Sequence, residues 1–208
     1  MLNSPDPRIA LAWAIADIHA KGWSTGTGGN FSLVLAHEPL LLLMAPSGVD
    51  KGLVKPADLI KVNGQAELVE GEGKASAETF LHLAIATSQN AGAILHTHSI
   101  FNTLISELYA EQGQVCFTNH EMLKGIAGIT SHTQTVSLPI LPNSQNMPQL
   151  AQEVTELLKH QPNPAPGILL AGHGLYAWGN NLFEARRHLE ILEFLLELNY
   201  RRRSLGLI

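Results

Sequence analysis

The sequence is poor in charged residues and has little basic character. Only 15% of its 208 residues are charged, whereas 45% are hydrophobic. The 13 basic residues are outnumbered by 18 acidic ones, which gives a net charge of −5, and the single basic tract is Arg201–Arg203. This balance argues against nucleic acid as a partner. With so few charged side chains, part of the surface is expected to be covered by other subunits, which favours an oligomer.

Cysteine and long apolar segments are also scarce. Cys116 is the only cysteine, so we expect no disulfide within the chain and no zinc cluster built from several cysteines. The longest strongly apolar run, Leu40–Ala45, has the length of a strand and falls far short of the roughly 18 residues of a membrane span. The first residues lack the basic-then-apolar pattern of a signal peptide. These features predict a cytoplasmic protein without a membrane partner.

The spacing of apolar residues predicts helices and strands interspersed along one chain. Helices are expected at 7–21, 77–88, 100–109, 148–159 and 182–203, and strands at 31–36, 40–44, 59–62, 93–95, 136–141 and 168–171. No repeat or flexible linker interrupts this order, and Gln161–Pro166 is interpreted as a stiff loop. We therefore predict one α/β domain over residues 1–208. The core face of the last helix is assigned to Phe183, Ile191, Phe194, Leu195 and Leu198.

Histidine is unusually frequent, with ten in the chain, and three of the ten follow apolar strands. In His96-Thr97-His98 the two imidazoles lie on the same side of an extended backbone, about 7 Å apart, where they can converge on a metal ion. His173 stands between two glycines, and a third imidazole would complete a metal site that leaves one position open. Taken alone, His96-Thr97-His98 is better explained as polar residues that end a strand, and His173 is at least as well explained as an exposed histidine in a turn. The other seven histidines are interpreted mostly as surface or helix residues.

Three segments offer hydroxyl and backbone N–H groups to an anion. Thr25-Gly26-Thr27-Gly28-Gly29-Asn30 precedes a predicted strand, and its N–H groups can face a phosphate. It is not a P-loop, because no Gly-Lys-Ser/Thr follows, and not a dinucleotide fingerprint, because no helix follows. Pro46-Ser47-Gly48 and Lys74-Ala75-Ser76 carry similar groups. A plain turn or a helix cap is the simpler explanation of each segment alone.

Two glutamates are candidates for proton transfer. Glu78 lies in the first turn of a predicted helix, where an acidic side chain also interacts favourably with the helix dipole. Glu121 lies in Asn119-His120-Glu121-Met122-Leu123-Lys124-Gly125, and such a side chain is most often solvated. Near a metal ion, either glutamate can act as a general acid or base.

In their order and spacing, these segments resemble the class II aldolase/adducin family over residues 22–188. The resemblance implies a three-layer α/β/α fold with a central, mainly antiparallel sheet, assembled as an oligomer such as a homotetramer. Within the family, residues 119–126 are similar to the dehydratases of methionine salvage. The shared segments are Gly26-Thr27-Gly28-Gly29-Asn30, Pro46-Ser47-Gly48, Ser76-Ala77-Glu78, His96-Thr97-His98-Ser99 and Gly172-His173-Gly174.

The resemblance also implies a role for each matching residue. His96, His98 and His173 match the ligands of one Zn²⁺ per subunit. Glu78 matches the acid/base of the aldolases, and Glu121 matches the glutamate proposed as acid/base in the dehydratases. Ala77 departs from the pattern, because the aldolases commonly have a serine there. The phosphate-site positions match Gly28, Gly29, Asn30, Ser47, Gly48 and Ser76.

A dehydratase of this type would act on a phosphorylated ketose, 5-methylthioribulose 1-phosphate. Zn²⁺ would polarise the ketone, Glu121 would take the proton from carbon 3, and the hydroxyl on carbon 4 would leave to give a 2,3-diketone phosphate. An aldolase or epimerase acting on fuculose or ribulose phosphate would use the same metal, and Glu78 keeps this alternative open. A non-catalytic domain, as in adducin, would not require three histidines and two glutamates.

Overall fold

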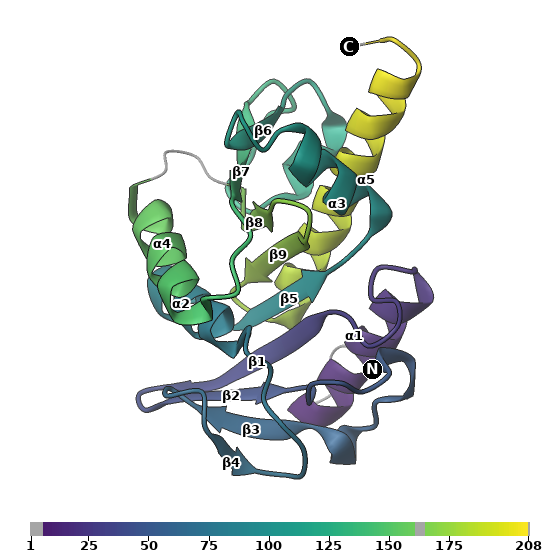
Figure 1. Cartoon of the computed structure of the whole chain (residues 1–208). Helices are drawn as coiled ribbons and strands as arrows, with labels where there is room; N and C mark the ends of the chain where they lie inside the picture. The colour runs from purple at the N-terminus through teal and green to yellow at the C-terminus, as the bar shows by residue number, and fades with distance from the viewer. Residues whose placement is uncertain (1–5, 161–164, 208) are drawn as a thin grey trace.

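The computed structural model describes residues 6–160 and 165–207, which form one nine-stranded sheet with helices against both faces (Figure 1). The strand order is β4-β3-β2-β1-β5-β9-β8-β7-β6. Neighbouring strands are antiparallel except β7 and β8, which are parallel. The predicted α/β/α class with a mainly antiparallel sheet is therefore confirmed.

The described strands are β1 (Asn30–His37), β2 (Leu40–Met44), β3 (Ile60–Asn63), β4 (Leu68–Glu70), β5 (Ala93–Thr97), β6 (Gln114–Phe117), β7 (Val136–Leu141), β8 (Gly167–Leu170) and β9 (Gly174–Gly179). The α-helices are α1 (Pro7–Ala20), α2 (Thr79–Gln89), α3 (Ile100–Leu108), α4 (Met147–His160) and α5 (Leu182–Ser204). Short 3₁₀ helices are η1 (Lys51–Leu53), η2 (Pro56–Asp58) and η3 (Glu121–Gly125).

Two apolar cores lie on opposite faces of the sheet. Buried residues of α1, α3 and α5 pack on one face, where Leu11 and Leu192 are fully buried. Residues of α2 and α4 pack on the other face, with Leu81 and Val154 fully buried. Figure 1 shows α2 and α4 side by side on this second face. With both faces covered, the central strands are rigid supports for side chains at their ends.

Every helix and strand predicted from apolar spacing is present, with ends shifted by a few residues. The unpredicted strands β4 and β6 are short, and β4 is exposed throughout. Strand β9 is buried at every position, so its sequence lacks the polar-apolar alternation that marks a half-exposed strand. Of the predicted stiff loop, residues 161–164 lie outside the described residues. No described helix is long and apolar enough to cross a membrane.

Two side-chain assignments from the sequence are wrong. The apolar spacing assigns Phe183 and Phe194 to the core face of the last helix, but they are 55% and 46% exposed. The buried face of α5 instead includes Leu189, Leu192 and Leu196, because the helix packs against the sheet and α3 at once.

Two of the seven histidines assigned mostly to the surface or to helices are also buried, namely His82 and His188. His188 donates from Nδ1 to the Trp178 carbonyl at 2.7 Å and accepts at Nε2 from the Ala127 N–H at 3.1 Å. Both ring nitrogens are therefore satisfied, and His188 joins α5 to the strand and loop beside it. His82 lies on α2, where Nδ1 is 2.7 Å from the hydroxyl oxygen of Ser32.

Candidate active site

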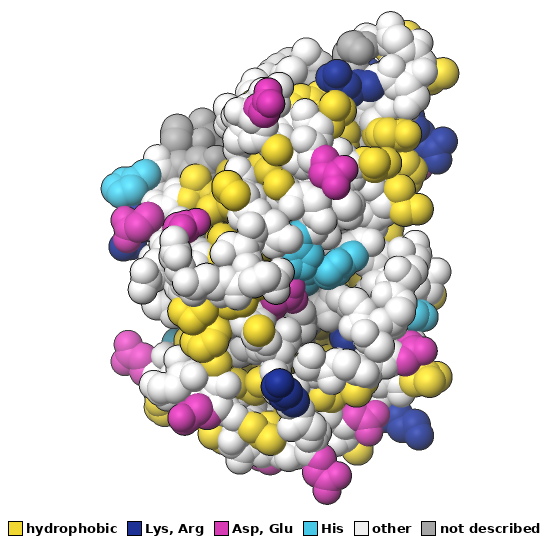
Figure 2. Space-filling model, in the orientation of Figure 1, with side chains coloured by type: hydrophobic (Ala, Val, Ile, Leu, Met, Phe, Trp, Pro, Cys, Tyr) yellow, Lys and Arg dark blue, Asp and Glu magenta, His cyan; other side chains and the backbone are white. Residues whose placement is uncertain are grey.

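Three adjacent strands bring distant parts of the sequence to one place. His96 in β5 is paired with Asn30 in β1 on one side and with Tyr176 in β9 on the other. His98 follows the end of β5, and His173 immediately precedes β9. The glycine-rich segment, the His-x-His segment and the glycine-flanked histidine therefore meet at one end of the strands. Figure 2 shows histidine and acidic side chains together in a hollow near the middle of this face.

The three imidazoles converge closely enough for one metal ion. The ring centroids of His96, His98 and His173 are 4.5–5.0 Å apart, and one nitrogen from each lies within 4.8 Å of the others. Nδ1 of His96 donates to the Leu175 carbonyl at 3.0 Å, an arrangement that fixes many metal-binding histidines. The other nitrogen, Nε2, is buried and has no hydrogen-bond partner among the described residues. This orphaned nitrogen fits a missing metal bond.

The ring of His96 is also held in place by an aromatic side chain of β9. It stacks on the Tyr176 ring with a centroid distance of 3.9 Å and an interplanar angle of 12°. Complete burial holds the pKa of His96 well below its usual range, although the nearby Glu78 carboxylate opposes this shift. Its imidazole is thus neutral at pH 7, which is the form that binds metals.

Glu78 places a carboxylate among the histidines. Its Oε2 accepts a hydrogen bond from the Asn30 side-chain amide and lies 3.7 Å from Nε2 of His96. Its Oε1 is 2.9 Å from Nε2 of His173. Burial raises the pKa of Glu78, but the hydrogen bond from His173 and electrostatic interactions with His96, His173 and His98 outweigh burial and lower it to about 2. The carboxylate is therefore ionised, and it can accept a proton or bind a cation.

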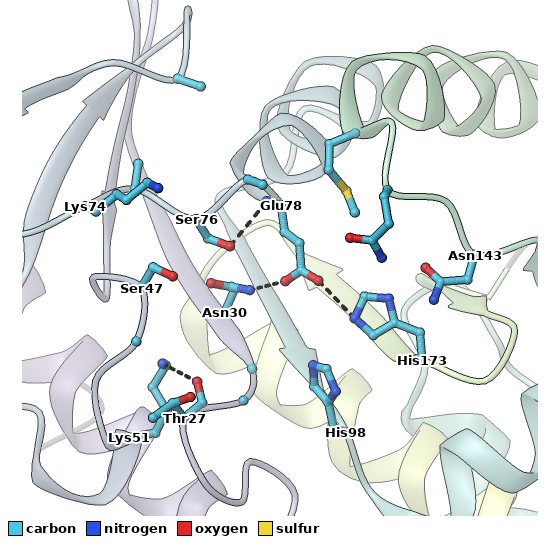
Figure 3. Close-up of a pocket in the computed structure, with 18 of the residues that line it drawn as sticks. Thr27, Asn30, Ser47, Lys51, Lys74, Ser76, Glu78, His98, Asn143 and His173 are labelled. Atoms are coloured by element: carbon cyan, nitrogen blue, oxygen red, sulfur yellow. Dashed lines mark hydrogen bonds and ion pairs between the residues drawn. The ribbon is translucent and has the colours of Figure 1, made fainter.

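These groups face a cavity of about 710 Å³. In Figure 3, Ser47, Lys74 and Ser76 lie on one side, Asn143 and His173 lie on the other, and Glu78 lies between them. His96 is fully buried behind the wall. Of the residues singled out from the sequence, the cavity is lined by Gly28, Gly29, Asn30, Ser47, Gly48, Ser76, Glu78, His98 and His173.

Two glycines are required by close backbone contacts beside the histidines. Gly29 has φ +84°, and a Cβ there would lie 2.9 Å from the carbonyl oxygen of His96. A Cβ on Gly174 would lie 2.2 Å from the carbonyl oxygen of Thr97 and 3.1 Å from Cε1 of His96. A side chain at either position would push the strands apart and displace His96.

The sequence did not single out several other residues that line the cavity. Lys51 is almost fully buried, and its ammonium group donates to the carbonyls of Thr27 at 2.9 Å and Val49 at 3.1 Å. Burial lowers the pKa of Lys51, while the Asp50 and Glu78 carboxylates oppose the shift. A lysine shortly after a Ser-Gly turn was a usable signal for an anion site. No local pattern distinguished the cavity residues that come from segment 143–147, namely Asn143, Gln145 and Met147.

Glu121 does not join this cavity in its own chain. It lies on η3, which packs against α5, and its side chain is 74% exposed. Its Oε1 is 2.6 Å from the Lys124 ammonium group, and hydrogen bonding to that group lowers the pKa of Glu121. Among the described residues that line the cavity, Glu121 is absent. The histidines and Glu78 therefore form the site of one chain without it.

The chain is similar to known proteins over nearly its whole length. Residues 9–200 match the family model for "Class II Aldolase and Adducin N-terminal domain". The chain is 42% identical over 198 residues to a methylthioribulose-1-phosphate dehydratase of Pectobacterium carotovorum subsp. carotovorum (strain PC1), with 94% of each chain covered. It is 37% identical over 199 residues to the protein of the same name from Exiguobacterium sp. (strain ATCC BAA-1283 / AT1b), with 95% of each covered.

A solved structure has the same fold. The crystal structure of L-fuculose-1-phosphate aldolase from Thermus thermophilus superposes with a TM-score of 0.73 at 25% sequence identity, and the match covers 95% of both chains.

Proposed function

The chain belongs to the class II aldolase and adducin family, and we propose that it is a hydro-lyase that removes water from 5-methylthioribulose 1-phosphate. The observation that carries this conclusion is the 42% identity, over 94% of both chains, to a relative named for that dehydration. The product is a 2,3-diketone that keeps the phosphate and the methylthio group. The reaction belongs to methionine salvage.

The residues of the cavity support a resident metal ion, which we propose to be one Zn²⁺ per subunit held by His96, His98 and His173. Three imidazoles with an open fourth position are a ligand set typical of catalytic zinc. Bound there, Zn²⁺ would polarise the ketone at carbon 2 and so acidify the hydrogen on carbon 3.

The protein must then move one proton. A carboxylate takes the proton from carbon 3, the hydroxyl on carbon 4 leaves as water after receiving a proton, and the resulting enol becomes the second ketone. One glutamate serves both steps if it returns the proton that it took. Glu78 and Glu121 are the two proposed carboxylates, and Glu78 already faces the cavity.

We propose that the substrate phosphate binds on the side of the cavity opposite His173. Gly28, Ser47, Gly48 and Ser76 offer hydroxyl and N–H groups there, and Asn30 aligns Glu78 beside them. Lys74 adds a cation on the same side (Figure 3). Hydroxyl, amide and ammonium donors together match the oxygen atoms of a phosphate dianion.

Replacing Lys74 with Met is expected to raise KM about tenfold and to leave kcat nearly unchanged, because the charged contact is equal in ground and transition states. Steady-state kinetics with the phosphorylated ketose would measure both constants. Lys61→Met is the matched control, since Lys61 pairs with Glu70 at 2.5 Å and does not line the cavity. An unchanged KM in Lys74→Met would contradict the proposal that the substrate phosphate binds beside Lys74.

We propose that the active form is a homotetramer in which Glu121 of one subunit serves the cavity of another. Glu121 is exposed and lies outside its own cavity, so it can act on substrate only across a subunit boundary. An exposed apolar surface on α3 and α5 is available for assembly, because Ile100 is 73%, Leu108 45% and Phe194 46% exposed. Figure 2 shows hydrophobic side chains gathered over these helices.

Light scattering at micromolar concentration is expected to give a mass of about 90 kDa, which is four times the 22.5 kDa of the chain. The physical reason is that an exposed apolar surface of this kind is costly in water unless it is covered. A mass of 22.5 kDa would contradict the oligomer and, with it, a role for Glu121 in another subunit's cavity.

We also propose a cytoplasmic location, which suits the single exposed thiol of Cys116.

The function is tested most directly by incubating zinc-loaded protein with 5-methylthioribulose 1-phosphate and following the diketone product. The same preparation is then given dihydroxyacetone phosphate and an aldehyde. Dehydration without aldol addition supports the proposal. Aldol addition without dehydration would instead assign the sugar-phosphate aldolase reaction, which the position of Glu78 keeps as the alternative.

A further inference from the structure

A buried carboxylate that the proposed reaction does not use lies behind the histidines. Glu193 is on α5, within the core between the helix and the sheet, and is only 3% exposed. Burying a carboxylate is costly unless hydrogen bonds compensate the lost water. Its contacts therefore show what the side chain holds in place.

Among the described residues, the side chains that donate hydrogen bonds to Glu193 all come from one short segment. Thr97 donates to Oε1 at 2.7 Å, Ser99 donates to Oε2 at 2.5 Å, and the Asn102 amide donates to Oε1 at 2.9 Å. Burial raises the pKa of Glu193, and the hydrogen bonds from Ser99, Thr97 and Asn102 oppose this rise. Both oxygens of the Glu193 carboxylate are thus hydrogen-bonded to side chains within residues 97–102.

One proposed metal ligand, His98, lies within this segment, and a second, His96, immediately precedes it. Side chains alternate along a strand, so Thr97 points to the face opposite His96 and His98. The hydrogen bond from Thr97 to Glu193 on one face of the strand therefore fixes the backbone that carries the two imidazoles on the other face. The Asn102 side-chain amide further fixes this backbone, because it donates to the carbonyl oxygen of Thr97 at 3.3 Å.

Ser99 ends the segment and ties it to the next helix. Its hydroxyl oxygen accepts the N–H of Asn102 at 3.1 Å as the N-cap of α3, while its hydroxyl hydrogen goes to Glu193. The start of α3, the end of β5 and the middle of α5 therefore meet at one carboxylate. An apolar side chain would pack there at lower desolvation cost but could hold none of these groups.

We propose that Glu193 is a positioning residue of the metal site: by accepting hydrogen bonds from Thr97, Ser99 and Asn102, it sets the positions of His96 and His98 for metal binding. The inference rests on the proposed three-histidine site. It adds that the metal affinity depends on a residue of α5 that contacts neither metal nor substrate.

Glu193→Gln is expected to weaken zinc binding by about 10- to 100-fold, the usual effect of losing a partner behind metal ligands. The glutamine amide has only one acceptor oxygen, and its NH₂ group would face donors. The zinc Kd is measured by competition with a chromogenic chelator, and thermal unfolding of the metal-free protein is measured separately. Glu190→Gln, on the same helix but paired with Arg186 and Lys21 near the surface, is the matched control.

A second variant guards against misfolding of the first. Thr97→Val keeps the shape of the side chain and removes one donor to Glu193, so it is expected to weaken zinc binding in the same direction. Unchanged zinc Kd in the folded variants, with only the unfolding temperature lowered, would overturn the inference and leave Glu193 a purely structural residue. Failure of the unmodified protein to bind zinc would overturn the proposed metal site itself, and the inference with it.

Discussion

Replacing His173 with Ala is expected to abolish both zinc binding and turnover. His173 supplies one of three imidazoles whose nitrogens lie within 4.8 Å of one another, and two remaining histidines hold zinc weakly. Without the ion, the several kcal/mol that it contributes to charge stabilisation are lost, which corresponds to about 10³-fold or more in rate. Zinc content after dialysis and initial rates measure the two effects.

His173 is the best of the three ligands for this test because its surroundings tolerate the change. Its side chain is 13% exposed and lies on the turn before β9, whereas His96 is fully buried in β5. Removal of His96 would also leave a gap above Tyr176 and weaken the core. His160→Ala, at the exposed end of α4, is the control for losing a histidine. Full zinc retention in His173→Ala would refute the ligand assignment.

Replacing Glu121 with Gln is expected to lower turnover by at least ~10²-fold and to leave zinc content unchanged. Glutamine keeps the size of the side chain but accepts no proton. Zinc stays because the proposed ligands are all imidazoles. Glu78→Gln is expected to have the smaller effect on kcat and to act mainly on substrate binding, since Glu78 is hydrogen-bonded to Asn30 beside the proposed phosphate site.

A mixing experiment separates the two subunits' contributions. Glu121→Gln and His173→Ala chains, each with little or no activity alone, are dissociated and reassembled together. If Glu121 serves a neighbouring cavity, some mixed interfaces combine an intact metal site with an intact Glu121, and activity returns. Near wild-type turnover of Glu121→Gln, together with an inactive Glu78→Gln, would reverse the roles of the two glutamates and favour aldolase-like chemistry.

The sequence predicted six of the nine described strands, the five described α-helices and several of the residues that line the cavity, because the patterns concerned are local. Apolar spacing marks a helix such as α4, and glycines mark the close approach beside His96. What the sequence did not reveal depends on pairing between distant segments. Phe194 fits the apolar stripe of α5 but points outward, and Glu193 beside it looks like an ordinary surface acid until its three donors are seen.

Glu121 also shows that a local sequence pattern does not reveal where a residue lies in the fold. Its segment is recognisable in the sequence, yet its position depends on η3 packing against α5, a contact between segments far apart in the chain. Met147 begins α4, which packs on α2, and Asn143 lies just before that helix. No sequence motif marks either residue as part of the cavity. Local patterns identify candidate groups, and tertiary packing decides which of them meet.

The pairing of Asn30 with His96, and of His96 with Tyr176, has a consequence for biosynthesis. Contacts between residues this far apart close large loops and form late in folding. During translation, β5 with His96 emerges from the ribosome long before β9, the strand that pairs with it, has been synthesised. The third histidine is synthesised just before β9, and Glu193 of α5 follows after it. The proposed metal site can therefore be complete only after His173 and β9 have been translated.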